Sequence, residues 1–219
     1  MKIYVVGSSK NKFLPLDNIR EKFLIDQPHK GDNIDFLNPW YCELTGLYYL
    51  WKHVDDEIVG LEHYRRYFVN SKNKLLSETE IKKLLETNDI IAYKYIGSNG
   101  ITAMSKSKKG KELAMALAIV YDKYGENIAS FFKSKLAGSY TFENNMFIGK
   151  KSILNDYFSF IFSILEEFDK YHKFKIPRID GYIAEYFFGP WLEYNKLKIA
   201  TPKRITYDQK LKRILTGHV

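Results

Sequence analysis

Cysteine is nearly absent from this sequence, since Cys42 is the only one among 219 residues. One thiol excludes a disulfide within the chain and a metal site built from several cysteines, and it fits a reducing compartment. Long hydrophobic runs are missing as well, because no apolar stretch approaches the ~20 residues that span a bilayer. The strand-like run 3–6 comes without the pattern of a secretory signal. We therefore expect a cytoplasmic protein, with any membrane contact peripheral and on the inner face.

Several motifs that define common enzyme classes are also missing. The sequence has no P-loop, no glycine fingerprint for dinucleotides and no nucleophile elbow, and its five histidines lack the spacing of metal ligands. No Asp-x-Asp motif is present. The pair Asp55-Asp56 precedes a predicted strand instead of following it, which is the wrong end for a metal-bound diphosphate. These absences argue against the classes that the motifs define.

The composition is that of a folded, basic protein. Hydrophobic residues make up 45% and aromatic residues 16%, enough for a sizeable core. The net charge of +8, from 34 basic and 26 acidic residues, favours anionic partners such as nucleotides, nucleic acid or an acidic membrane. A lysine-rich solvated surface explains the same charge. A basic nucleic-acid-binding module is thus one alternative, but the basic residues are spread along the chain and no docking motif is present.

The order of predicted elements indicates an α/β fold. Buried strands are expected at 3–6, 58–61 and 89–95, and helices at 40–52 and at 77–87, where Ser77 and Glu80 form a capping box. Strand, helix and strand in this order favour a mostly parallel central sheet flanked by helices. The rest of the chain is assigned as a polar loop to residue 38, a basic loop at 96–111, helices at 111–124, 126–136, 152–171, 181–188 and 207–216, and strands at 145–149 and 196–200. No repeat or linker divides it, so we expect one domain, 1–219.

The strongest local signal follows the second predicted strand, where a buried apolar run passes into the cluster His63, Arg65 and Arg66. Ligands of open α/β sheets lie outside the carboxyl ends of the strands. The planar guanidinium group matches phosphate oxygens. The cluster is therefore a candidate diphosphate site, and the alternative is a surface ion-pair cluster.

Glu185 is the second signal, because it is the only charge between Gly181 and Leu192. A lone carboxylate on an apolar helix is costly to bury without a partner. It therefore has a structural partner or takes part in chemistry. Asp180 is expected to cap the same helix.

Two pairs of short polar side chains are weaker candidates. Asp32 and Asn33 could hold a ribose or base edge, or close an Asx-turn. Asn144 and Asn145 precede an apolar run and could bond sugar hydroxyls or close a turn.

These motifs together resemble a family of capsular or exopolysaccharide biosynthesis glycosyltransferases, long described as a domain of unknown function. The resemblance covers almost the whole chain in order. Its most specific blocks are ELTGLY at 43–48 and HYRRYF at 63–68, supported by DNI at 32–34, Asn38, Trp51-Lys52, NMFI at 145–148, Arg178 and GYIAE at 181–185.

The resemblance implies a Rossmann-like, GT-A-type fold. It also implies transfer of a hexose, galactose or galactofuranose among the options, from a UDP-sugar to a growing surface polysaccharide or lipid-linked glycan. An enzyme-like scaffold without activity is a further alternative. On this reading Asp32, Asn33, His63, Arg65 and Arg66 bind the nucleotide diphosphate.

The remaining candidate residues are assigned to the sugar and to catalysis. Asn144, Asn145 and Arg178 contact the sugar. Glu185 is the base of an inverting reaction, with Asp180 in reserve; a retaining reaction needs neither. With cations in the place of a metal, no cofactor is expected to be required, although Mn²⁺ or Mg²⁺ dependence stays open. Basic residues at 106–111 and Lys210, Lys212 and Arg213 are candidates for contact with a membrane surface.

Overall fold

The computed structural model describes residues 1–97 and 100–207. The strands are β1 (Lys2–Gly7), β2 (Arg20–Leu24), β3 (Ile58–His63), β4 (Arg66–Val69), β5 (Ile90–Ile96), β6 (Tyr140–Lys150), β7 (Ile199–Ala200) and β8 (Lys203–Thr206). The helices are α1 (Asn38–Tyr41), α2 (Leu44–His53), α3 (Glu78–Thr87), α4 (Gly100–Lys106), α5 (Gly110–Tyr124), α6 (Glu126–Leu136), α7 (Lys151–His172) and α8 (Ile179–Tyr194), with a 3₁₀ turn at Asp35–Leu37.

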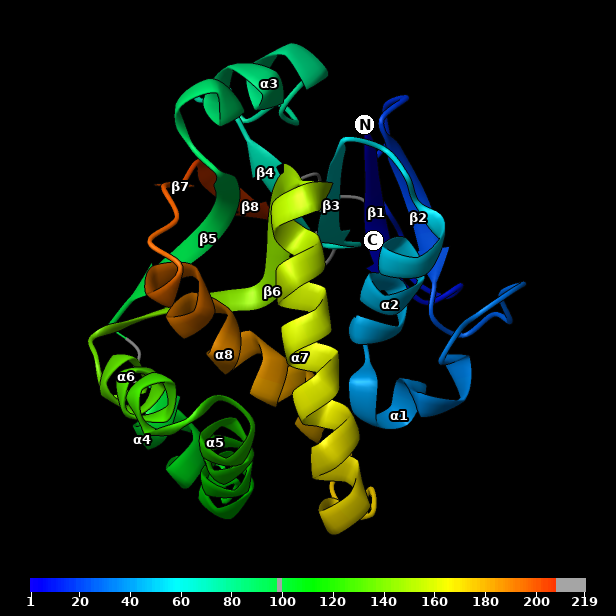
Figure 1. Cartoon of the computed structure of the whole chain (residues 1–219). Helices are drawn as coiled ribbons and strands as arrows, with labels where there is room; N and C mark the ends of the chain where they lie inside the picture. The colour runs from blue at the N-terminus through cyan, green and yellow to red at the C-terminus, as the bar shows by residue number, and fades with distance from the viewer. Residues whose placement is uncertain (98–99, 208–219) are drawn as a thin grey trace, which may run out of the picture.

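The central sheet has the order β2-β1-β3-β6-β5-β7 (Figure 1). The strands β2, β1, β3, β5 and β7 run in one direction, and only β6 on this path runs against its neighbours. The expected mostly parallel sheet flanked by helices is therefore confirmed. Within it Val6 pairs with His63, so that β1 and β3 end level with each other.

The two faces of the sheet bury alternate residues of its strands. On one face, Val6, Leu61 and Phe147 pack under α2, α7 and α8, and α7 lies in front of β6 in Figure 1. On the other face, Ile3 and Ile148 belong to a smaller core with Ile81 and Leu85 of α3. This alternation places the ends of β1 and β3 between two rigid layers.

Several predicted elements are confirmed with small changes of boundary. The capping box of α3 forms as expected, with Ser77 accepting from the Glu80 N–H and the Glu80 carboxylate accepting from the Ser77 N–H. The expected short strand at 145–149 is longer in the structure and begins at Tyr140.

The structure differs from three of the expected assignments. The polar stretch before residue 38 contains β2, whose apolar content is too low to stand out in the sequence. The single helix 40–52 is two helices, because Cys42 has a positive φ of 51° that interrupts it. The basic loop 96–111 contains α4. The expected tail helix 207–216 lies outside the described residues except for Tyr207.

The expected end of the helix 181–188 is also wrong, since α8 continues through Gly189 and Pro190 to Tyr194. A Cβ on Gly189 would lie 2.7 Å from a ring carbon of Phe142, so this glycine lets α8 approach β6 closely. Packing on both sides holds the helix despite the hydrogen bond that proline cannot donate. None of the described helices is long and apolar enough to cross a membrane.

Candidate active site

A cavity of about 590 Å³ opens at the carboxyl ends of β1 and β3. We call it the cationic cavity. Its polar lining comes from segments that lie far apart in the sequence: the ends of β1 and β3 with the residues that follow them, α1 with the two residues after it, the middle of β6, and the start of α8. The lining residues are Val6, Gly7, Asn11, Ile25, Asn38, Pro39, Cys42, Glu43, His63, Tyr64, Arg65, Arg66, Asn144, Arg178, Tyr182 and Glu185. The cavity lies where the sequence places the candidate diphosphate site, outside the carboxyl ends of the strands.

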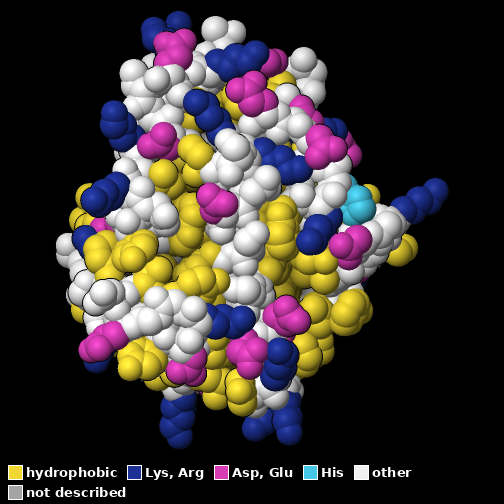
Figure 2. All heavy atoms as spheres, viewed as in Figure 1, with side chains coloured by type: hydrophobic (Ala, Val, Ile, Leu, Met, Phe, Trp, Pro, Cys, Tyr) yellow, Lys and Arg dark blue, Asp and Glu magenta, His cyan; other side chains and the backbone are white. Residues whose placement is uncertain are grey.

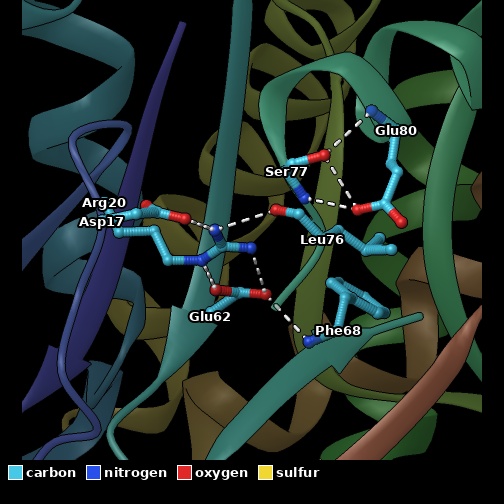
Figure 3. A network of polar contacts seen from close by, with 7 residues as sticks. All are labelled: Asp17, Arg20, Glu62, Phe68, Leu76, Ser77 and Glu80. Carbon is cyan, nitrogen blue, oxygen red and sulfur yellow. Dashed lines mark hydrogen bonds and ion pairs between the residues drawn. The ribbon is translucent and has the colours of Figure 1, made fainter. Parts of the chain in front are cut away.

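A tight turn between β3 and β4 presents the two arginines. Arg65 is exposed at the turn and Arg66 is half-buried, and His63 pairs with Arg66 across the hairpin. Just before the turn, the Glu62 carboxylate accepts from the Phe68 N–H at 2.9 Å, which joins the two strands behind the arginines (Figure 3).

Glu62 is itself held by a buried ion pair. Arg20 Nε donates to Glu62 Oε2 at 2.7 Å, and both side chains are completely buried. The same guanidinium group donates to Asp17 at 2.6 Å and to the Leu76 carbonyl at 3.1 Å (Figure 3). The turn that carries Arg65 and Arg66 is thus held to the core by Arg20, the first residue of β2.

A wide bulge in β6 brings Asn144 into the cavity. Ala92 of β5 pairs with Phe147, but Lys94, two residues on, pairs with Phe142, so β6 has extra residues at this point. Asn144 and Asn145 take up the bulge with φ values of 71° and 49°, a left-handed conformation that asparagine tolerates.

The two asparagines of the bulge have different partners. His63 Nε2 donates to the Asn144 carbonyl oxygen, so the proton of this ring is on Nε2. Burial, and then the nearby Arg66, lowers the pKa of His63, which favours the neutral ring. Asn145 is buried, and its amide donates to Glu43 at 2.8 Å and to the Gly181 carbonyl at 3.1 Å. Only Asn144 lines the cavity.

The arginines of the cavity are the source of its positive charge. Within the described residues, Arg65, Arg66 and Arg178 form no ion pair with a carboxylate. The pKa of Arg66 is lowered by burial and then by Arg65 and Arg204. Like charges therefore crowd around the half-buried Arg66, an arrangement that an anion would relieve.

Two carboxylates, those of Glu43 and Glu185, line the cavity together with these arginines. Burial raises the pKa of Glu185 to about 7, with Glu43 and Glu143 adding to the effect and a hydrogen bond from the Asn144 backbone opposing it. The Asn144 amide lies 3.5 Å from Glu185 Oε1. A carboxyl group that exchanges its proton near neutral pH suits general acid–base chemistry.

Asp180 does not reach the cavity. It is completely buried, no side-chain cap forms at the start of α8, and the expected capping role is wrong. Burial and the charge of Asp169 raise the pKa of Asp180 to about 8, and burial raises that of Asp169 to about 6. Tyr41 donates to Asp169 at 2.8 Å. This carboxyl pair joins α1, α7 and α8, and neither of its residues lines the cationic cavity.

Asp32 and Asn33 lie apart from the arginines and do not line the cationic cavity. The Tyr48 hydroxyl donates to Asp32 at 3.0 Å. Asn33 accepts from the Asp35 N–H at 3.2 Å, which is the Asx-turn left open by the sequence. The structure therefore does not bring these two residues together with the arginines.

Two charged residues of the site were missed in the sequence. Glu43 lines the cavity. The same signal that marks Glu185 could have found it, because Glu43 is also a lone carboxylate within an apolar stretch. Arg204 Nη1 donates to Asn144 Oδ1, and its guanidinium carbon lies 3.8 Å from the centre of the Tyr93 ring. No sequence signal marked Arg204, because β8 was not predicted.

The lining suits an anion better than a metal ion. In the part of the chain that the structure describes, no three His, Cys, Asp or Glu side chains form a group that could hold a metal ion. Among the described residues the cationic cavity has two carboxylates and one histidine of lowered pKa beside three arginines.

Comparison with solved structures identifies the class of fold. The chain is similar to the apo structure of WbbM, a bifunctional glycosyltransferase, with a TM-score of 0.77 and 25% sequence identity over 95% of this chain. It spans 45% of that protein, less than half of its length. The fold is thus one that a glycosyltransferase uses.

The family follows from the sequence itself. The chain belongs to the family described as a domain of unknown function, DUF4422, whose model matches residues 2–196. No curated protein sequence matches the chain. Family and fold together make the chain a member of a glycosyltransferase-related family.

Proposed function

We propose that this protein is a glycosyltransferase that moves a hexose from a UDP-sugar to a growing surface polysaccharide or lipid-linked glycan. The observation that carries the proposal is the cationic cavity, in which three arginines without carboxylate partners meet a carboxylate of raised pKa. The similarity to a glycosyltransferase structure over 95% of the chain supports it.

In this proposal Arg65 and Arg66 bind the diphosphate of the donor. A hydrogen bond to a charged group contributes about 1.5–3 kcal/mol. When the bond between the sugar and the diphosphate breaks, negative charge grows on the leaving phosphate, and cations already in place stabilise it. His63 and the buried Glu62 hold the turn that positions them.

Glu185 acts as the general base of an inverting transfer. It takes the proton of the acceptor hydroxyl while that oxygen bonds to the anomeric carbon. The bond from this carbon to the phosphate oxygen breaks, and its electron pair leaves with UDP. Asn144 and Arg178, which share the cavity wall with Glu185, contact sugar hydroxyls, and Asn145 positions Glu43.

The transfer does not require a metal ion in this proposal, because the arginines supply the positive charge. The region after β5 lies close to the site, since Lys109 Nζ is 5.1 Å from the centre of the Tyr182 ring. We place a lipid-linked acceptor on this side, with the basic residues of α4 and α5 toward an anionic membrane surface. Flotation with anionic liposomes tests this contact.

The function is tested by incubating the protein with a panel of UDP-hexoses and measuring release of UDP, with GDP-sugars and oligonucleotides as alternative ligands. We expect UDP-sugars to raise the melting temperature and to be consumed, and Arg66→Ala to abolish both effects. Stabilisation by oligonucleotides alone would instead favour the nucleic-acid-binding alternative. The anomeric configuration of the product, read by NMR, tests inversion.

A further inference from the structure

A second cavity, of about 460 Å³, lies beside α1. We call it the aromatic cavity. Helix α1 separates it from the cationic cavity, because Asn38 and Pro39 line the cationic cavity while Tyr41 lines the aromatic one. The lining residues are Ile34, Phe36, Leu37, Tyr41, Tyr48, Phe162, Glu166, Asp169 and Phe174. None of them takes part in the function proposed above.

The walls of this cavity are aromatic rings in fixed positions. The Phe162 ring stacks on Tyr41 at 6.4 Å between centroids and meets Tyr48 edge-on at 5.2 Å. Phe36, at the mouth, is 74% exposed. Figure 2 shows hydrophobic side chains gathered on the surface near α1 and the end of α7, with acidic side chains beside them. Phe36 and the partly exposed Tyr48 offer ring surface that suits the C–H faces of sugar rings, whereas Tyr41 and Phe162 are largely buried.

The backbone at one side of the cavity is held in an uncommon conformation. Lys173 and Phe174 are consecutive non-glycine residues with φ values of 53° and 54°. Trp40 Nε1 donates to the Phe174 carbonyl at 2.7 Å, which holds the Phe174 ring against Trp40 at 4.8 Å. Backbone strain of this type clusters at ligand sites, where the surrounding structure maintains it.

The charge of the aromatic cavity is opposite to that of the cationic cavity. Among the described residues its lining has no lysine or arginine and includes Glu166 and Asp169, and Asp32 accepts from the Tyr48 hydroxyl at its edge. Lys52 lies 5.3 Å from the centre of the Tyr48 ring but is not a lining residue. Within the described residues, the exposed Glu166 carboxylate accepts no hydrogen bond from a side chain. Phosphates are repelled here, whereas uncharged hydroxyl groups find acceptors.

We propose that the aromatic cavity is a second carbohydrate-binding site, which holds neutral sugar units of the acceptor glycan away from the reacting end. The inference rests on the proposed function, because it assigns the cavity to the same glycan. Bound at this site, the glycan contacts α1 from the side opposite to the donor. A longer acceptor therefore binds more tightly than a short one, while the reaction itself is unchanged.

The direct test uses neutral tetrasaccharides of glucose, galactose and mannose as probes, with intrinsic fluorescence and saturation-transfer NMR as readouts. We expect at least one of them to bind and Phe36→Ala to weaken its binding about fivefold, the factor that corresponds to the roughly 1 kcal/mol of one aromatic contact. Glu166→Gln should weaken it as well. Tyr171→Ala is the matched control, because Tyr171 is 62% exposed on α7 and does not line the cavity. Saturating UDP should not displace the probe.

Three results would overturn the inference: no tetrasaccharide binds, Phe36→Ala binds as tightly as the unchanged protein, or only octyl glucoside binds, through its alkyl chain. The proposed function can be contradicted independently of the second site. If tetrasaccharides bind in a way that depends on Phe36 but no UDP-sugar is consumed, the carbohydrate site stands and the transferase does not. If sugar is transferred but Phe36→Ala has the same KM for long and short acceptors, the transferase stands and the second site does not.

Discussion

Arg20 and Glu62 form an ion pair in the core of the protein, with Nε and Oε2 2.7 Å apart and neither side chain accessible to solvent. The pair joins the first residue of β2 to the end of β3, where Glu62 directly precedes His63. Its position makes it a support for the cationic cavity, because the same carboxylate accepts from Phe68 on the strand that follows the arginines.

Removal of one charge of this pair should destabilise the fold strongly. Glu62→Gln leaves the buried Arg20 with only the partly exposed Asp17 as a carboxylate partner, and breaking a buried pair costs about 3 kcal/mol or more. Urea unfolding measures the cost. Glu78→Gln, which removes the exposed i,i+4 pair with Lys82, is the matched control and should hardly move the midpoint. Equal midpoints for the two variants would contradict the role given to Glu62.

The sequence was sufficient for the α/β class because most of the central strands and long helices have clear hydrophobic patterns, whereas β2, β8 and α4 do not. The position of Arg65 and Arg66 at the end of β3 followed from a buried run that passes directly into charge. Two of the wrong helix boundaries depend on backbone conformation or on contacts between distant residues. Cys42 interrupts a helix through its backbone angle, and Gly189 permits a helix to continue against Phe142, which no local pattern records.

The lining of the cationic cavity could also be predicted only in part, because some of its residues are placed by contacts between distant strands. Glu185 and Arg178 share a wall with the arginines, as expected from their sequence context. Asn144 reaches it only through the bulge in β6, whose register depends on pairing with β5. Asp32 looked like a nucleotide ligand but lies by Tyr48, because the first forty residues contain a strand that sequence patterns did not reveal.

Activity should depend on the protonation of Glu185. The raised pKa of about 7 means that the carboxylate needed as a base is lost as the pH falls below neutrality. We expect kcat/KM to rise with pH through about 7. Glu185→Gln should lower kcat by about 10²–10⁴-fold, the usual contribution of a general base, whereas Glu86→Gln on the exposed face of α3 should not. A flat profile between pH 6 and 8, or full activity of Glu185→Gln, would exclude Glu185 as the base.

Stability should fall as the pH rises, because of the buried pair Asp169 and Asp180. The pKa of Asp180 is about 8 in the folded protein and near 3.8 when unfolded, so the folded state keeps a proton that the unfolded state loses. The stabilising effect is complete below about pH 4 and lost as the pH passes through about 8. Unfolding in urea at a series of pH values measures the slope.

Asp180→Asn keeps an uncharged side chain at this position at every pH. The variant should therefore show a smaller decrease in unfolding free energy between pH 5 and 8 than the unchanged protein. An identical slope in both proteins would show that Asp180 does not hold a proton in the folded state.

Transfer should survive removal of divalent metals. If arginines supply the charge that stabilises the leaving UDP, excess EDTA should leave the rate of UDP release within about twofold of the untreated rate. Complete loss of activity that Mn²⁺ restores would contradict a metal-free mechanism, although it would leave the transferase assignment intact.

The central claim is that the unpaired arginines of the cationic cavity bind a diphosphate, and calorimetric titration with UDP and with uridine tests it most directly. The unchanged protein should bind UDP at least a hundredfold more tightly than uridine, a difference of about 2.7 kcal/mol that corresponds to one or two charge-assisted hydrogen bonds. Arg66→Ala should lose most of this difference, while Lys82→Ala, a change on exposed α3, should keep it. Equal affinities for UDP in the unchanged protein and in Arg66→Ala would contradict the account.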